Sequence, residues 1–270
     1  MPLLRFVRET LLDPRSPACW WRHPVMALRV VAGAAENTLQ PLADRLPGPR
    51  RHECPVCGWR GPRFRNFLSG DEVIRHCICP GCGSFDRQRL LVLGVRDELR
   101  QRGSLPGVMV GFSLSPALRF LLEHEGLSRC FRCDIDVADR RFAPDFAADL
   151  RRTPLRDASV DWIFCSHVLE HISELELCLD ELERILVPGG TAWLQVPLEP
   201  GLAHSRRIPV DRYRAHAHAW QFAPDFGLLV ERPGWHVTEV VARDAVGGPE
   251  RARYGIDPDE RYWLVRKHGR

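Results

Sequence analysis

The chain lacks several features that mark specialised proteins. Its 38 basic and 35 acidic side chains leave a net charge of +3, which gives no general indication of a nucleic-acid partner. Aromatic residues make up only 9% of the sequence, so few side chains are offered for base stacking. The longest apolar run near the start, residues 25–35, is too short for a bilayer span and contains Arg29. Arg5 and Arg8 interrupt the first apolar run, so no secretory signal is visible and the cytoplasm is the expected compartment.

Cysteines are the most informative residues that are present. Among the ten, two C-P-x-C-G sequences occupy residues 54–58 and 79–83. Each C-x-x-C turn can supply two thiolates, and the following glycine lets the backbone curl so that its amides face the sulfurs. Four thiolates complete a tetrahedral site of the structural type, with no position left for chemistry. We predict a zinc ribbon with a structural zinc ion, rather than free thiols, and expect these ligands: Cys54, Cys57, Cys79 and Cys82.

Residues 157–197 carry the clearest secondary-structure pattern. Residues 160–165 form a short apolar run typical of a strand that is buried on both faces. A helix is expected over about 173–186, and its core face is expected to include Leu175, Leu177 and Leu182. Proline and glycine at 188–190 should end the helix, and residues 191–196 should form the next strand. This strand–helix–strand order predicts a βαβ unit of a parallel sheet.

Other elements follow from the same periodicities. Helices are expected over residues 2–12, 24–46 and 84–101, and strands over 106–112, 130–133, 235–241 and 261–266. Trp20 and Trp21 could contact a membrane surface or a partner, but we favour their packing onto the rest of the chain.

The central stretch resembles class I S-adenosylmethionine (SAM)-dependent methyltransferases, of the type 11-like kind. The resemblance is carried by D-W-I-F-C-S-H-V-L-E-H at 161–171, E-L-E-R-I-L-V-P-G-G at 181–190 and W-L-Q-V-P at 193–197. The run C-P-x-C-G-S-x-x-R-x-R at 79–89 resembles the segment that joins a zinc ribbon to the catalytic domain in some of these enzymes. This likeness implies a Rossmann-like α/β fold with a seven-stranded sheet whose last strand is antiparallel.

The resemblance also implies a domain organisation. We expect a helical N-terminal extension over residues 1–50, the zinc ribbon over 51–86 and the SAM-dependent methyltransferase domain over 87–270.

The residues expected to bind SAM follow from the same likeness. An acid at the end of the second strand binds the ribose hydroxyls in such enzymes, which points to Asp134, with Asp136 as the alternative. The acid that faces the adenine amine corresponds to Asp149, and the neighbouring Leu150 would pack on the ring. The first turn and the end of the fourth strand supply the remaining expected cofactor residues: Gly111, Phe112, Ser113, Ser166 and His167.

One motif departs from the family pattern. The usual glycine-rich turn, about D-x-G-x-G-x-G, is replaced here by G-F-S-L-S-P at residues 111–116. Either serine could cap the helix that follows, and Gly111 allows some close approach of the backbone.

Methyl transfer from a sulfonium is an in-line displacement, so the protein mainly positions the two reactants and removes a proton where the acceptor needs it. His167 is the candidate base, with His171 one helical turn later as a second candidate. The alternative is that both histidines only line the cofactor pocket or cap a helix.

Three functions are compatible with the sequence. We favour methyl transfer to a small or medium-sized metabolite of anionic or sugar-like character. The Arg- and His-rich residues 198–221 suit an anionic substrate, and the alternative for this segment is a solvated basic loop. A second hypothesis is an RNA methyltransferase whose zinc ribbon and Arg-rich face bind nucleic acid, with these arginines on phosphates: Arg60, Arg63, Arg65, Arg75, Arg87 and Arg89. A third is a non-catalytic, methyltransferase-like binding protein, which only the altered turn supports.

Overall fold

The structure is a computed structural model that describes residues 24–45, 48, 50–68, 73–127, 129–137, 144–208 and 218–269. The helix predicted over residues 2–12, the two tryptophans at 20 and 21 and residues 209–217 of the basic segment lie outside the described residues. Within the described ranges, no helix combines the length and the apolar character needed to cross a bilayer.

A seven-stranded sheet forms the centre of the molecule, with the strand order β12–β13–β9–β8–β5–β6–β7. The strands are β5 (Met109–Phe112), β6 (Cys130–Asp134), β7 (Phe146–Ala147), β8 (Val160–Ser166), β9 (Leu186–Gln195), β12 (Trp235–Val241) and β13 (Arg261–Lys267). Five neighbouring strands, β7, β6, β5, β8 and β9, pair in parallel. Strand β13 runs antiparallel to both of its neighbours, β9 and β12. The expected sheet, including its antiparallel last strand, is confirmed.

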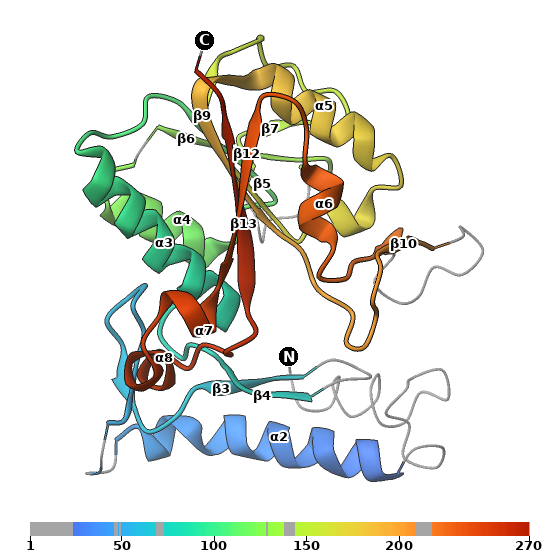
Figure 1. The fold of residues 1–270 in the computed structure, drawn as a ribbon. Coiled ribbons are helices and arrows are strands. Elements are labelled where there is room, and N and C mark those ends of the chain that lie inside the picture. Colours follow the sequence, from blue (N-terminus) through green and yellow to red (C-terminus); the bar gives the residue numbers. More distant parts are fainter. Residues whose placement is uncertain are drawn as a thin grey trace.

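Helices cover both faces of this sheet (Figure 1). On one face lie α3 (Asp86–Arg102) and α4 (Pro116–His124), and on the other lie α5 (Leu175–Ile185) and α6 (Phe226–Val230). Two short helices, α7 (Ala242–Ala245) and α8 (Gly248–Tyr254), lie at the end of the sheet that faces the N-terminal module. The central strand β8 is buried on both faces, as its apolar sequence predicts, and Trp162 and Phe164 are 1% exposed or less.

The βαβ unit differs from the prediction in two details. Leu177 was expected in the core but is 50% exposed, because the buried stripe of α5 runs through Cys178 and Leu182 instead. Strand β9 begins at Leu186, directly after the helix, and the proline and glycines lie within it at a register irregularity. Gly189 has a φ of 78° there, a conformation that glycine adopts without strain.

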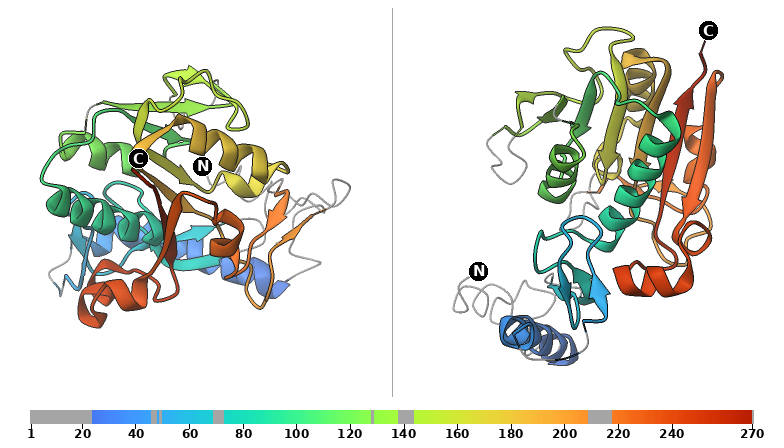
Figure 2. Two further views of the ribbon diagram at one scale, coloured as in Figure 1. Left: turned by 45° about the horizontal axis from the view of Figure 1, so that its top comes forward. Right: turned by 90° about the vertical axis from the view of Figure 1, so that its left-hand side faces the viewer.

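The N-terminal module consists of two antiparallel hairpins and one helix. The hairpins are β1 (His52–Glu53) with β2 (Arg60–Gly61), and β3 (Arg65–Leu68) with β4 (Val73–Ile78). Helix α2 (Pro24–Ala43) lies along the second hairpin, on the side away from the central sheet (Figure 2). Asn37 and Asn66 join them through two 2.8 Å hydrogen bonds between side chain and backbone.

The hairpin module and the sheet share one hydrophobic core. Cys54 and Phe64 of the hairpins belong to the same buried cluster as Leu90 of α3 and Trp162 of β8. The stability of the module and that of the sheet are therefore coupled through direct packing.

Candidate functional site

A cavity of about 520 Å³ opens at the carboxyl ends of β5, β6 and β8. Open α/β sheets bind their ligands at this edge, because the loops that follow the strands diverge there. Six of the eight expected cofactor residues line the cavity: Phe112, Ser113, Asp134, Asp149, Leu150 and His167. His171, the second candidate for catalysis, lines it as well, together with residues that the sequence did not single out: Cys133, Ile135, Ala148, Arg151, Val168, Ile172, Ser173 and Glu174.

Gly111 and Ser166 do not line the cavity. Gly111 lies within β5, and a Cβ atom added to it would lie 2.8 Å from the Leu114 side chain, so its small size serves packing. The Ser166 hydroxyl donates to the side chain of Gln195 on the neighbouring strand at 2.9 Å.

The altered turn after β5 is held by Ser113. This residue has a φ of 47°, the left-handed region that the glycines of a glycine-rich turn adopt readily. Its backbone N–H donates to the Cys133 carbonyl at 2.9 Å, and its hydroxyl donates to Asp134 Oδ2 at 2.6 Å. Where the family pattern has a flexible glycine, this chain has a serine whose left-handed backbone is held by two hydrogen bonds to β6.

Asp134 lies at the end of β6 and presents its carboxylate at the cavity wall. Its Oδ1 accepts a 2.9 Å hydrogen bond from the backbone N–H of Asp136, so both oxygens have a partner that fixes their orientation. A carboxylate has about four lone-pair sites, and free sites remain for a vicinal pair of hydroxyl groups. Asp136, the alternative, does not line the cavity.

Asp149 is bound by an arginine that the sequence analysis did not identify. Three Arg151 side-chain contacts of 2.6 to 3.1 Å reach both Asp149 oxygens, and Arg151 also donates to Glu174 at 3.2 Å. The hydrogen bonds from Arg151 lower the pKa of Asp149, so this carboxyl is ionised at neutral pH. An acid and an arginine two residues apart on one loop are the only signal that could have indicated this pair.

A buried network from α5 supports the loop that carries Asp149. The backbone N–H and the hydroxyl of Thr153 both donate to Glu181 Oε1 at 2.6 Å. Arg184 donates to the same carboxylate and to the carbonyl of Leu155 at 2.9 Å. Burial alone would raise the pKa of Glu181, but the hydrogen bonds from Arg184 and Thr153 outweigh burial and lower it. Glu181 and Arg184, which belong to the methyltransferase-like run at 181–190, therefore hold the loop that forms one wall of the cavity.

We expect Glu181→Gln to lower the free energy of unfolding by about 1–3 kcal/mol at pH 7, because it weakens charge-assisted hydrogen bonds in a buried site. A lowered pKa in the folded state stabilises the fold above the unfolded-state pKa of about 4.3. That contribution disappears as the pH falls through the folded-state pKa.

Urea unfolding at several pH values measures this effect. The difference in the free energy of unfolding between the wild type and Glu181→Gln should become smaller as the pH falls. As a control, Glu183→Gln on the same helix should change that free energy by less than about 0.5 kcal/mol. A difference that stays constant down to the acid transition would contradict the assignment.

Two histidines follow β8 around a buried acid. His167 has a φ of 57° and donates its backbone N–H to the Gln195 carbonyl at 2.8 Å. Its Nδ1 lies 3.4 Å from Oε1 of Glu170, a residue of the short helix η2 (Leu169–His171) that is only 1% exposed. Desolvation and the charge of Arg87 lower the pKa of His167, so the ring is neutral at neutral pH and can accept a proton. Among the described residues, four other than glycine have left-handed backbones, and two of them, Ser113 and His167, line the cavity.

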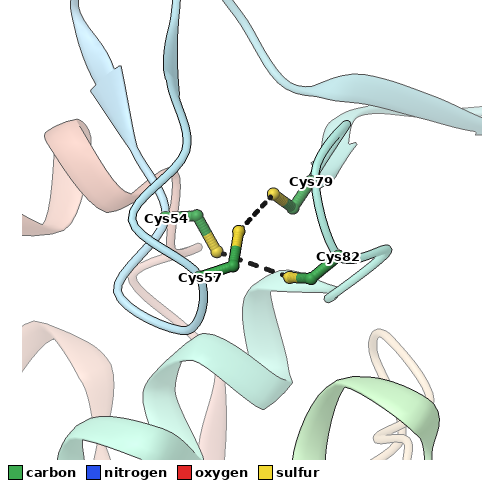
Figure 3. Close-up of side chains that lie close together, drawn as sticks. All are labelled: Cys54, Cys57, Cys79 and Cys82. Carbon is green, nitrogen blue, oxygen red and sulfur yellow. Dashed lines mark hydrogen bonds between the residues drawn. The ribbon is translucent and has the colours of Figure 1, made fainter. Parts of the chain in front are cut away.

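The four cysteines of the two turns converge in the hairpin module (Figure 3). Cys54 Sγ lies 3.7 Å from Cys82 Sγ, and Cys57 Sγ lies 3.7 Å from Cys79 Sγ. Zinc–sulfur bonds of about 2.3 Å at tetrahedral angles place the sulfurs about 3.8 Å apart, so the four thiols fit a zinc ion. This group does not include Cys77, whose thiol donates to the Ile74 carbonyl instead.

The glycines of both turns have the conformation that the motif requires. Gly58 and Gly83 have φ values of 72° and 74°, and each donates its N–H to the carbonyl of the first cysteine of its turn at 2.9 Å. Any residue with a Cβ atom would be strained at both positions.

Residues 110–194, just under a third of the chain, match the family described as "Methyltransferase domain". These residues form a methyltransferase domain. All expected cofactor residues and both candidate catalytic histidines lie within the matched span, whereas the cysteine module lies outside it.

Several solved structures resemble the methyltransferase domain and its surroundings. The CurJ carbon methyltransferase is 14% identical, with 68% of this chain and 55% of that chain covered at a TM-score of 0.45. A SAM-dependent methyltransferase from Archaeoglobus fulgidus is 14% identical (65% and 94% covered, TM-score 0.42), and one from Mesorhizobium loti is 18% identical (65% and 100%, TM-score 0.43). The chain spans about half the length of the CurJ enzyme. A comparison with curated proteins gave no match.

Proposed function

We propose that this methyltransferase acts on a small or medium-sized metabolite of anionic or sugar-like character. The observation that carries the proposal is the cavity at the carboxyl edge of the sheet, which contains the acids expected for a nucleoside and two histidines beside them. Its volume of about 520 Å³ lies within the range of small-molecule sites.

In this proposal the chain holds SAM with the two acids of the cavity. Asp134 accepts the ribose hydroxyls, with its orientation set by Ser113, and Asp149 accepts the adenine amine while Leu150 packs on the ring. When bound, SAM supplies an electrophilic methyl group. The protein then needs to exclude water and to keep the acceptor atom in line with that group.

The histidines would serve the acceptor. His167 is neutral and lines the cavity, so it can take a proton from a hydroxyl or amine acceptor. His171 is 44% exposed at the same wall and offers a donor to an anionic group.

The four-cysteine site would hold zinc in a structural role. Its cysteines come from two turns of the hairpin module, and a closed set of four thiolates leaves no position for an acceptor. We therefore assign zinc to the folding of the module and not to methyl transfer.

The RNA alternative has less support. Arg89 is fully buried and cannot reach a phosphate, so its assignment to nucleic-acid binding was wrong. Arg63 bonds to Gln40 and Arg75 pairs with Glu36, which reduces the basic surface available to a phosphate backbone.

Calorimetric titration with S-adenosylhomocysteine tests the proposed function. We expect micromolar binding to the wild type and a loss of at least about tenfold in Asp134→Ala, because the ribose would lose a charge-assisted partner. Asp136→Ala is the matched control and should bind within about twofold of the wild type. Circular dichroism would verify that both variants are folded.

Two outcomes would change the conclusion. A loss in Asp136→Ala but not in Asp134→Ala would transfer the ribose contact to Asp136. No binding to the folded wild type at millimolar ligand would favour the non-catalytic hypothesis.

A further inference from the structure

A second group of metal-ligating side chains lies beside the cavity. Ligand atoms of Glu170, His171 and His218 all lie within 4.8 Å of one another. His171 Nε2 is 3.9 Å from Glu170 Oε1, and the two imidazole rings meet edge to face with centroids 4.9 Å apart. None of these atoms belongs to the four-cysteine site.

The backbone holds the two contributing segments together. The N–H of Ala219 donates to the carbonyl of Glu170 at 2.6 Å, and the indole N–H of Trp220 donates to the carbonyl of Ser173 at 3.3 Å. The short strand β11 (Trp220–Gln221) also pairs with β10 (Arg206–Arg207). His218 therefore reaches η2 from a segment that is anchored on two sides, so the ligand set is largely formed in advance.

Glu170 is the residue that most needs a partner. Its side chain is 1% exposed, and its Oε2 has no hydrogen-bond partner among the described residues, while Oε1 faces the two histidines at 167 and 171. A buried carboxylate oxygen without a partner is costly, and native proteins rarely keep one. A cation between Oε1 and the imidazoles would neutralise the charge of this buried carboxylate, which is the larger part of that cost.

We propose that Glu170, His171 and His218 bind a divalent transition metal ion. Two imidazoles and one carboxylate match the ligand preferences of zinc, iron(II) and cobalt(II), whereas magnesium and calcium need mainly oxygen ligands. Bonds of about 2.1 Å require ligand atoms within about 4.2 Å of each other, so a small rotation of the half-exposed His171 ring closes the set.

His167 supports this site without belonging to the ligand set. Its Nδ1 lies 3.4 Å from Glu170 Oε1 and can orient that carboxylate, as residues behind metal ligands commonly do. It is a positioning residue for the metal.

Three protein ligands leave at least one coordination position open, and His171 places the ion at the cavity wall. An acceptor with a hydroxyl or carboxylate oxygen could occupy that position next to the methyl donor. This role of the ion rests on the proposed function, whereas the binding of the ion does not.

Cobalt(II) added to protein that holds a single equivalent of zinc tests the site, because that zinc occupies the four cysteines and leaves the second group of ligands open to cobalt. We expect one additional equivalent to bind and to give visible d–d bands without the near-ultraviolet bands of a cobalt–thiolate bond. His171→Ala, His218→Ala and Glu170→Gln should each weaken cobalt binding by at least about tenfold, since even residues behind a ligand contribute that much. His236→Ala removes an exposed imidazole of β12 and should bind like the wild type.

Each contrary result is distinct. The absence of an additional equivalent, bands of cobalt–thiolate bonds, or equal binding by the ligand variants would overturn the metal site. The same samples are titrated with S-adenosylhomocysteine. A protein that binds S-adenosylhomocysteine but does not bind cobalt would refute the metal site and leave the proposed function intact. A protein that binds cobalt but does not bind S-adenosylhomocysteine would refute only the proposed function.

Discussion

Cys57→Ser is expected to unfold the hairpin module and to abolish its zinc binding. The module has short strands and few buried apolar side chains, so we expect the proposed zinc to supply most of its folding free energy. Structural zinc sites contribute about 10–16 kcal/mol of apparent binding free energy at pH 7. Without a metal, burial raises the pKa of the Cys57 thiol to about 12, so this sulfur needs a bound cation to remain a thiolate at neutral pH.

The loss of stability in Cys57→Ser should extend beyond the hairpin module to the sheet. Cys54 and Phe64 pack in the same core as Leu90 and Trp162, so unfolding of the hairpins exposes part of the sheet domain. We expect the thermal midpoint of the whole protein to fall, and a strong chelator to produce the same fall in the wild type.

Circular dichroism and zinc content measure both effects. Cys77→Ser is the matched control, because Cys77 is a buried cysteine of the same module that lies outside the group of four. It should retain one zinc per chain at the four-cysteine site. A folded Cys57→Ser protein with an unchanged midpoint would show that the module does not depend on the metal.

Arg89→Ala is expected to lower the free energy of unfolding by about 3–5 kcal/mol, as removal of a buried, hydrogen-bonded charge does. The Arg89 side chain is 0% exposed, and its guanidinium lies 4.0 Å from the centre of the Phe64 ring. It donates to four carbonyl groups at 2.7 to 3.0 Å, those of Tyr254, Cys77, Ser84 and Gly255. Truncation would leave these oxygens without a donor and would open a cavity.

The position of Arg89 explains the size of this effect. Its four acceptors belong to the hairpin module and to the end of α8, while Arg89 itself lies on α3. One side chain thus joins three segments, and burial lowers its pKa because desolvation disfavours the charge.

Urea unfolding at pH 7 tests this prediction. Arg89→Lys should recover only part of the stability, because an ammonium group has three donors and lacks the planar fork of arginine. Arg100→Ala removes an exposed arginine of the same helix and should cost less than about 0.5 kcal/mol. An Arg89→Ala protein within about 1 kcal/mol of the wild type would contradict the joining role.

Local patterns in the sequence were sufficient for the longer strands of the sheet and for the two cysteine turns. Strand β8 follows from an apolar run, and β12 and β13 follow from their β-branched and aromatic residues. The C-P-x-C-G spacing places four thiols in two turns whatever surrounds them. The edge of the sheet on which the cavity opens also follows, because parallel strands all end on the same side.

Only the tertiary structure decided the contacts between distant segments. The run C-P-x-C-G-S-x-x-R-x-R ends at Arg89 but does not predict that this side chain is buried, because its burial depends on carbonyl groups about 165 residues away. Glu181 supports the loop at Thr153, and His218 lies beside Glu170, for the same reason. A hydrophobic pattern fixes which face of an element turns inward, but the partner that meets a polar side chain depends on how the elements pack.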